Sequence, residues 1–217
     1  DYSHRKSWVI DRLHELVDLA FLRESRTGYG FSHDVVRSVV YEAVPPSRKR
    51  RLHRRAGEAL EELSPGSVES LAIHFDRGEV WSKAAHWYRQ AGEQARAVYA
   101  GAQAVEYYDR ALTAWSHLDT RDEALGLRLY RERGRICQDV GRFDQAEDDF
   151  RAALGLARRI GGVASEARIL NHLSYLTYQR GAYDEAARIA AEALDLAGRV
   201  EDDTEVATAH FNQANAL

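Results

Sequence analysis

A block of six residues recurs in this chain, and both copies continue into a stretch rich in Ala and Leu. The first copy, at 141–146, reads GRFDQA, and the second, at 181–186, reads GAYDEA, a spacing of 40 residues. The stretch around Ala104 fits the same frame. A fixed period of this size predicts stacked helix pairs, because one pair alone cannot bury its apolar face. The first question for such a chain is therefore which surface binds a partner.

Composition agrees with a folded protein. The chain has 217 residues, 45% of them hydrophobic and 29% charged, and a formal net charge of −4, which gives no general reason to expect nucleic-acid binding. Cys137 is the single cysteine, so no intrachain disulfide can form. No apolar run suits a membrane span and no signal peptide is visible. These features predict a cytoplasmic location.

Two features indicate a piece of a longer protein. The sequence contains no Met, and its last stretch, 203–217, stops within a helical pattern that lacks a cap or breaker. We therefore expect a multidomain parent.

The repeat pattern predicts an array of helices after the last of three prolines, Pro65. The expected helices are 66–77, 80–98, 101–117, 121–139, 143–159, 163–180, 183–198 and 203–217. Three pairs follow in order from 80 to 198, and the last helix begins a fourth pair. Gly78, Gly141 and Gly181 are expected to end helices in the left-handed conformation that glycine tolerates.

The first 65 residues follow another pattern. Apolar spacing predicts an amphipathic helix at 7–19. A β-hairpin is expected next, with strands at 21–24 and 29–32, and then helices at 33–43 and 47–63. Helix, hairpin and helix are typical of the end of a winged helix. The predicted fold is all-α, with a partial winged helix at 1–45 that carries one small β-hairpin, a connecting helix at 46–65 and an α-solenoid of antiparallel helix pairs at 66–217.

The repeated block resembles the tetratricopeptide repeat. The likeness lies in Gly-x-aromatic-Asp-x-Ala followed by Ala-Leu, and it covers about 66–217. The spacing exceeds the 34 residues of the standard repeat, which implies longer helices, as in the repeat arms of bacterial regulators.

Residues 31–37, FSHDVVR, and 50–61, RRLHRRAGEALE, resemble a segment of bacterial STAND-type signal-transduction ATPases. In that AAA-like, NB-ARC-related family, which includes large LuxR-type and antibiotic-regulator-type transcriptional regulators, this segment joins the winged helix to the repeats. The resemblance implies that His33, with Asp34 and Arg37, senses nucleotide in the full-length parent. The tripeptide Ser32-His33-Asp34 is similar to the Met-His-Asp motif of NB-ARC proteins, with Ser32 in place of Met. The alternative is structural: Asp34 caps the next helix and His33 packs as a ring.

No phosphate-binding loop is present, because none of the three lysines follows a glycine. The parent would bind ATP or ADP elsewhere, so we expect no cofactor and no catalysis here. The nine histidines include no pair three or four residues apart, which argues against a local metal site. Cys137 is expected in the core, whereas Asp148 and Asp149 are expected on a solvated face or as caps.

The expected working surface is the groove lined by the first helix of each pair. A mixture of Arg and Tyr suits an acidic peptide, because Arg offers forked donors and Tyr gives contact area at low entropy cost. Equally, the arginines could simply solvate the groove or bond to neighbouring helices. The predicted groove residues are Arg128, Arg131, Arg135, Gln138, Asn171, Tyr175, Tyr178, Gln179, Thr208, Phe211 and Asn215.

The basic run at 47–56 makes direct DNA binding a third, weaker possibility. Against it, Leu52, Ala56, Ala59, Leu60 and Leu63 form an apolar stripe that predicts a half-buried helix. The favoured function is a non-catalytic regulatory fragment that binds a protein, a peptide or a small inducer on the repeats and contacts an upstream ATPase module. The alternative is a passive peptide-binding scaffold.

Overall fold

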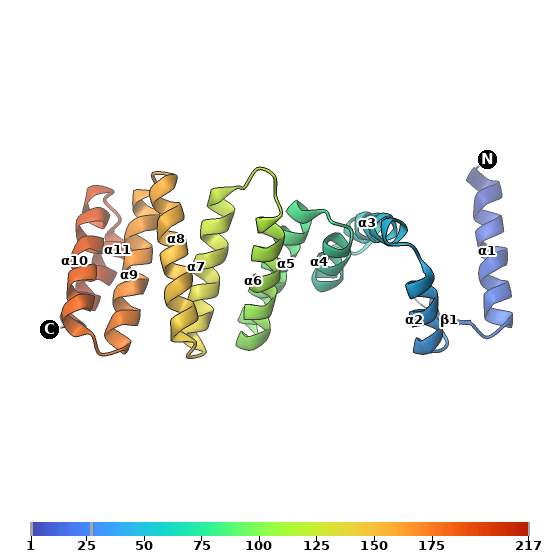
Figure 1. Ribbon diagram of the computed structural model, residues 1–217, viewed down its shortest axis with the longest axis horizontal. Coiled ribbons are helices and arrows are strands. Elements are labelled where there is room, and N and C mark those ends of the chain that lie inside the picture. The colour runs from blue at the N-terminus through green and yellow to red at the C-terminus, as the bar shows by residue number, and fades with distance from the viewer. Residues whose placement is uncertain (1, 27, 217) are drawn as a thin grey trace. The chain divides into compact units, whose positions relative to one another are not determined.

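The computed structural model describes residues 2–26 and 28–216 (Figure 1). In this part the chain forms eleven helices and one two-stranded hairpin. The contacts divide the chain into two compact units, Asp1–Leu52 and His53–Leu217. The division falls inside the predicted connecting helix, and the predicted domain bounds 1–45, 46–65 and 66–217 stay a prediction.

The first unit contains the predicted helix and hairpin. Helix α1 is Tyr2–Asp18, strands β1 and β2 are Leu22–Ser25 and Gly28–Phe31, and helix α2 is Asp34–Ala43. The strands are antiparallel, with Leu22 opposite Phe31. No residue of 8–26 or 28–52 is buried, although the unit is rich in apolar side chains. This unit therefore has no core of its own in the described residues.

Helix α3 (Pro46–Leu63) runs into the second unit, which continues with eight further helices. They are α4 (Val68–Arg77), α5 (Trp81–Ala97), α6 (Gly101–Ser116), α7 (Glu123–Asp139), α8 (Phe143–Arg159), α9 (Val163–Gln179), α10 (Tyr183–Arg199) and α11 (Asp203–Ala216). The predicted partners α5 and α6, α7 and α8, and α9 and α10 pack together, and α11 packs on α9 and α10. The predicted all-α solenoid with one small hairpin is confirmed (Figure 1).

Three of the helix pairs are locked by a glycine that faces an aromatic ring. The pairs are Gly57–Phe75, Gly92–Tyr108 and Gly134–Phe150, and a Cβ atom on any of these glycines would lie within 3.0 Å of the ring. The α9–α10 pair has Ser174 and Ala190 at the equivalent positions, and its Ser174 hydroxyl donates to the Ala186 carbonyl at 2.9 Å. The backbone spacing of the repeat is therefore the same in this pair, but a hydrogen bond replaces the glycine–aromatic contact between the two helices.

The predicted role of the glycines holds at two of three turns. Gly141 and Gly181 are left-handed, with φ of 79° and 80°, but at the first turn Glu79 takes the positive φ of 54°. Gly78 keeps a right-handed φ of −83°. Its need for glycine is close packing, because a Cβ atom there would lie 2.9 Å from the backbone nitrogen of Arg54.

The predicted apolar stripe on α3 is wrong at its ends. Leu52 is 48% exposed and Leu63 is 81% exposed, whereas the buried residue of this helix is Gly57. Ala59 is exposed as well, whereas Leu60 packs against the core as predicted. The buried face of α3 is therefore centred on Gly57, which lies against the Phe75 ring.

Candidate functional site

The first helices of successive pairs border two adjoining cavities of about 400 and 410 Å³. Both are lined by Arg135, His172 and Tyr175. We call the two cavities together the repeat groove. Its other lining residues are Gln138, Asp139, Arg168, Asn171, Gln179, Glu205, Thr208, Phe211 and Asn212. A volume of this size is within the range of ligand pockets.

The structure brings most of the predicted groove residues together. Seven of the eleven line the cavities, namely Arg135, Gln138, Asn171, Tyr175, Gln179, Thr208 and Phe211. Arg128, Arg131, Tyr178 and Asn215 do not line them. The Tyr178 ring lies instead between the rings of Tyr175 and Tyr183, with centroids 6.3 and 5.6 Å away. That these residues bind a partner stays a prediction.

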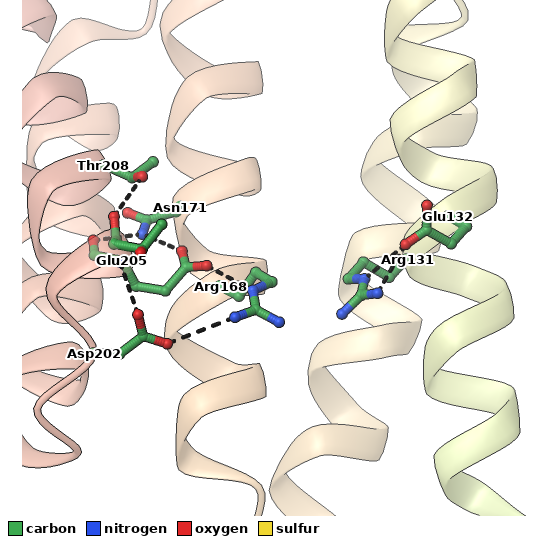
Figure 2. A network of polar contacts seen from close by, with 8 residues as sticks. Arg131, Glu132, Arg168, Asn171, Asp202, Glu205 and Thr208 are labelled. Carbon is green, nitrogen blue, oxygen red and sulfur yellow. Dashed lines mark hydrogen bonds and ion pairs between the residues drawn. The ribbon is translucent and has the colours of Figure 1, made fainter. Parts of the chain in front are cut away.

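Arg131 and the two arginines that line the groove, Arg135 and Arg168, already have carboxylate partners within the protein. Arg131 contacts Glu132 at 2.8 Å, and Arg135 contacts the same side chain at 3.4 Å. Arg168 pairs with Glu205 at 2.6 Å. Figure 2 shows that Arg131 and Glu132 lie on one helix, α7, whereas the Arg168–Glu205 pair reaches from α9 to α11. Internal pairing reduces the positive charge that the groove offers to an acidic peptide.

The Arg168–Glu205 pair belongs to a polar network that holds α11 against α9. The Asn171 amide donates to the Glu205 carbonyl at 3.0 Å and to its carboxylate at 2.9 Å. The Asn212 amide in turn donates to the Asn171 carbonyl at 2.9 Å, and the Asp202 carboxylate caps α11 by accepting from the Glu205 N–H at 3.2 Å. Asn171, predicted as a partner-binding residue, thus also has a structural task (Figure 2).

His172 is a groove residue that the sequence analysis did not single out. Its ring stacks on Phe150, with centroids 5.1 Å apart and planes at 8°. Burial, helped by Arg135, lowers the pKa of His172 to about 4, so the imidazole is neutral at pH 7. Its position in the sequence could have identified it, because residues 168, 172, 175 and 179 share one face of a helix.

The predicted nucleotide-sensing residues lie in the first unit at the start of α2. His33 is the residue before the helix, in extended conformation with φ of −137°, and its side chain makes no capping bond. Asp34 is the first helical residue and lies 3.3 Å from Arg37. Asp34 is therefore not the cap, which corrects that expectation. His33 is exposed, so it is not a packed ring in this unit.

Other candidate chemistry is placed as follows. Cys137 is buried, and burial raises the pKa of its thiol to about 11, so it is an unreactive core residue as predicted. Asp149 corrects the prediction of a solvated face, because it is 1% exposed. No group of three or more metal-ligating side chains occurs among the described residues. In the same part of the chain, no helix has the length and apolar character to cross a bilayer.

Two basic residues of α3 make contacts inside the unit to which each of them belongs. Arg54 donates to the Gly78 carbonyl at 3.1 Å, and the Lys49 ammonium lies 4.5 Å from the centre of the Tyr41 ring. These contacts give the basic run a structural role, and none of them favours DNA binding.

Helices α4 to α11 thus form a tetratricopeptide-like α-solenoid with a groove along its first helices. The tetratricopeptide repeat family matches residues 127–199 by sequence. This stretch covers α8, α9 and α10 and most of α7.

Known proteins support the fold. An uncharacterized protein of Rhizobium meliloti (strain 1021) is 26% identical over an alignment of 132 residues, which covers 57% of this chain and 13% of that protein. The chain thus spans about an eighth of the length of this curated relative. Two solved structures are similar in fold. BtubC (BKLC) from P. vanneervenii has a TM-score of 0.50 and 20% identity, over 80% of this chain and 66% of that one. Aspartyl phosphate phosphatase F from Bacillus subtilis has a TM-score of 0.55 and 14% identity, over 83% and 49%.

Proposed function

We propose that this chain is a non-catalytic regulatory part of a larger protein and that its repeat groove binds a protein or peptide partner. The observation that carries the proposal is the pair of adjoining cavities between α7, α9 and α11. Repeat arrays of this type commonly use such surfaces for extended partners.

The chemistry of the groove indicates which part of a partner it would hold. Tyr175 is 39% exposed and Phe211 is 61% exposed, and both line the more apolar of the two cavities, beside the neutral His172. Large aromatic side chains give contact area at low entropy cost and dominate many interfaces. Since the arginines are paired internally, we propose that an apolar or aromatic side chain of the partner is the anchor and that Arg135 adds a polar contact.

We further propose that the parent is a multidomain bacterial signalling ATPase of the STAND type, such as a transcriptional regulator. The sequence around His33 supports this, and so does the first unit, which leaves apolar side chains such as Trp8, Val35 and Val39 more than 60% exposed. Such side chains need a covering surface, which the rest of a winged helix in an ATPase module would supply. In this proposal His33, Asp34 and Arg37 face nucleotide in the parent.

A site-specific cross-link tests the groove. A photoreactive phenylalanine at Phe211 in the full-length protein should yield a cross-linked partner, and the same group at Tyr99, which is 96% exposed outside the groove, should not. Binding of that purified partner should then fall at least tenfold in the variant Tyr175→Ala/Phe211→Ala, because both walls of the cavity are removed. Equal cross-linking at the two positions, or unchanged affinity of the double variant, would reject the groove as the binding surface.

A further inference from the structure

Two successive junctions of the solenoid have equivalent positions but different contents. The first junction is formed by α6, α7 and α8, and the second by α8, α9 and α10. In the first, the Arg133 guanidinium bonds to Asp149 at 2.5 and 2.9 Å and to Asp109 at 2.6 Å. Tyr130 lies beside it, with its ring centre 5.7 Å from the guanidinium carbon. Long side chains therefore occupy the space between α6 and α8.

The repeat frame identifies the matching residues of the second junction. Starting from the first residues of α7 and α9, Glu123 and Val163, Arg133 corresponds to Leu173 and Tyr130 to Leu170. From the starts of α8 and α10, Asp149 corresponds to Ile189. By the same alignment of α6 with α8, Asp109 corresponds to Arg151. The second junction thus lacks the ion-pair triad: the aliphatic Leu173 and Ile189 stand in place of Arg133 and Asp149, and Arg151 stands in place of Asp109.

A cavity of about 410 Å³ lies at this second junction. Its apolar lining is aliphatic throughout and comes from all three helices: Leu154, Leu170, Leu173, Leu176 and Ile189. Leu154 belongs to α8 and Ile189 to α10, and the three other leucines lie on α9. Thr177 adds one hydroxyl.

Charged side chains form the rim and have ion-pair partners; Glu185, for example, lies 3.6 Å from Arg188, which is outside the rim. Arg158 of α8 reaches Glu192 of α10 at 3.0 Å and so bridges the two walls. At the other end Arg180 pairs with Glu147 and with Asp144. Arg151 pairs with Glu147 at 2.5 Å. The rim therefore presents no surplus of either charge to a ligand.

We propose that this cavity, on the α8–α10 side of α9, is a binding site for a neutral aliphatic group such as a medium-length alkyl or acyl chain. The aliphatic walls favour a flexible chain because they offer neither an aromatic ring for a planar ligand to stack on nor an unpaired charge for an ionic one. The polar end of the ligand lies at the paired rim or at Thr177. This site is separate from the repeat groove and shares none of its lining residues.

The test uses 1-octanol as probe and methyl NMR of the purified chain as readout. Addition of 1-octanol should shift the methyl signals of Leu154, Leu173 and Ile189 in a saturable way. Octanoate and octylammonium should bind at least tenfold more weakly, because a charged head is not matched at the paired rim. No saturable shift up to the solubility limit, or tighter binding of either ion, would overturn the proposal.

A transplant between the junctions supplies the decisive variant. Arg151→Asp/Leu173→Arg/Ile189→Asp places the three polar residues of the first junction in the second and should abolish octanol binding, because a guanidinium and two carboxylates then replace part of the aliphatic wall. If that variant does not fold, Ile189→Phe, which fills the cavity with an apolar ring, should still weaken binding at least tenfold. Tyr175→Ala, in the groove, should bind octanol as the wild type does. Unchanged binding by a folded filled variant, or loss of binding in Tyr175→Ala, would refute the site.

Discussion

The junction around Arg133 and the junction around Leu173 share one backbone frame, but one contains a network of ion pairs and the other a cavity. The first buries the Arg133 guanidinium between two aspartates, and the side chain of Asp149 is 2% exposed. The second has Leu173 and Ile189 in place of Arg133 and Asp149 and leaves a cavity. A repeat frame therefore sets where helices lie, whereas the chemistry of the side chains at equivalent positions sets whether ion pairs close the space between them.

The helix pairs at these two junctions, α7–α8 and α9–α10, also differ in the size of the side chains that their second helices bury. Phe150 is fully buried against Gly134, while α10 buries only small side chains: Ala186, Ala190, Ala193 and Ala197. Because hydrophobic stabilisation grows with the apolar area removed from water, the α9–α10 pair gains less from each contact. From this difference we expect the α7–α8 pair to be held more firmly than the α9–α10 pair.

The largest expected effect concerns Arg133. Burial raises the pKa of Asp149, although hydrogen bonds to Arg133 oppose this, so the carboxylate depends on its partner. Arg133→Ala should lower the free energy of unfolding by about 3–5 kcal/mol, the range for one partner removed from a buried ion pair. Urea unfolding measures the change.

Two variants sharpen this result. Arg133→Leu/Asp149→Ile gives the first junction the residues of the second and should lie within about 1 kcal/mol of the wild type, because no unpaired charge stays buried. Arg188→Ala, whose side chain is 79% exposed, should cost less than about 0.5 kcal/mol. A double variant as unstable as Arg133→Ala would show that packing, and not charge, holds the first junction.

The next effect is a pH dependence through His172, which stacks on Phe150 where α9 meets α8. Its pKa is lowered to about 4 in the fold, so the unfolded chain takes up the proton first as the pH falls. Its contribution is complete above about pH 6.5 and is lost toward pH 4, at about 1.4 kcal/mol per pH unit. Urea titrations between pH 7 and 5 should show a loss of about 2 kcal/mol.

The variant His172→Phe keeps the aromatic stack and cannot titrate, so its stability should depend less on pH by that amount. The exposed His210 gives the matched variant His210→Phe, which should follow the wild-type curve. A wild-type slope retained in His172→Phe would assign the pH dependence to other groups.

The smallest effects compare the two kinds of pair closure. In Gly134→Ala the new Cβ atom would lie 2.9 Å from the Phe150 ring, and we expect a net loss of about 1 kcal/mol after the gain in helix propensity. Ser174→Ala removes one hydrogen bond but gains propensity, so its free energy of unfolding should change by less than about 0.5 kcal/mol. Thermal unfolding compares the two.

Gly155 offers the control, since no atom lies within 4 Å of a Cβ built there. Gly155→Ala should stabilise the chain by about 0.5–1 kcal/mol through helix propensity alone. Equal stabilisation by Gly134→Ala would mean that the ring moves freely and that the glycine contact does not lock the pair.

The sequence by itself determined the helix array, the pairing of the helices and the hairpin. These depend on local signals: the spacing of apolar residues, the repeated Gly-x-aromatic-Asp-x-Ala block and glycines at turns such as 141 and 181. The same periodicity brought together seven of the eleven predicted groove residues, because positions on one face of a helix meet the same space.

Only the tertiary structure decided how individual polar residues are used. In the sequence, Asp149 has the pattern of a solvated acid beside Asp148. Arg168 and His172 carry no sequence signal that distinguishes them from other residues of a helix. Their burial and their partners come from other helices, such as Arg133 for Asp149, Glu205 for Arg168 and Phe150 for His172. Contacts between residues far apart in the chain leave no local periodicity, and a cavity such as the one at Leu173 and Ile189 depends on the summed volumes of side chains from three helices.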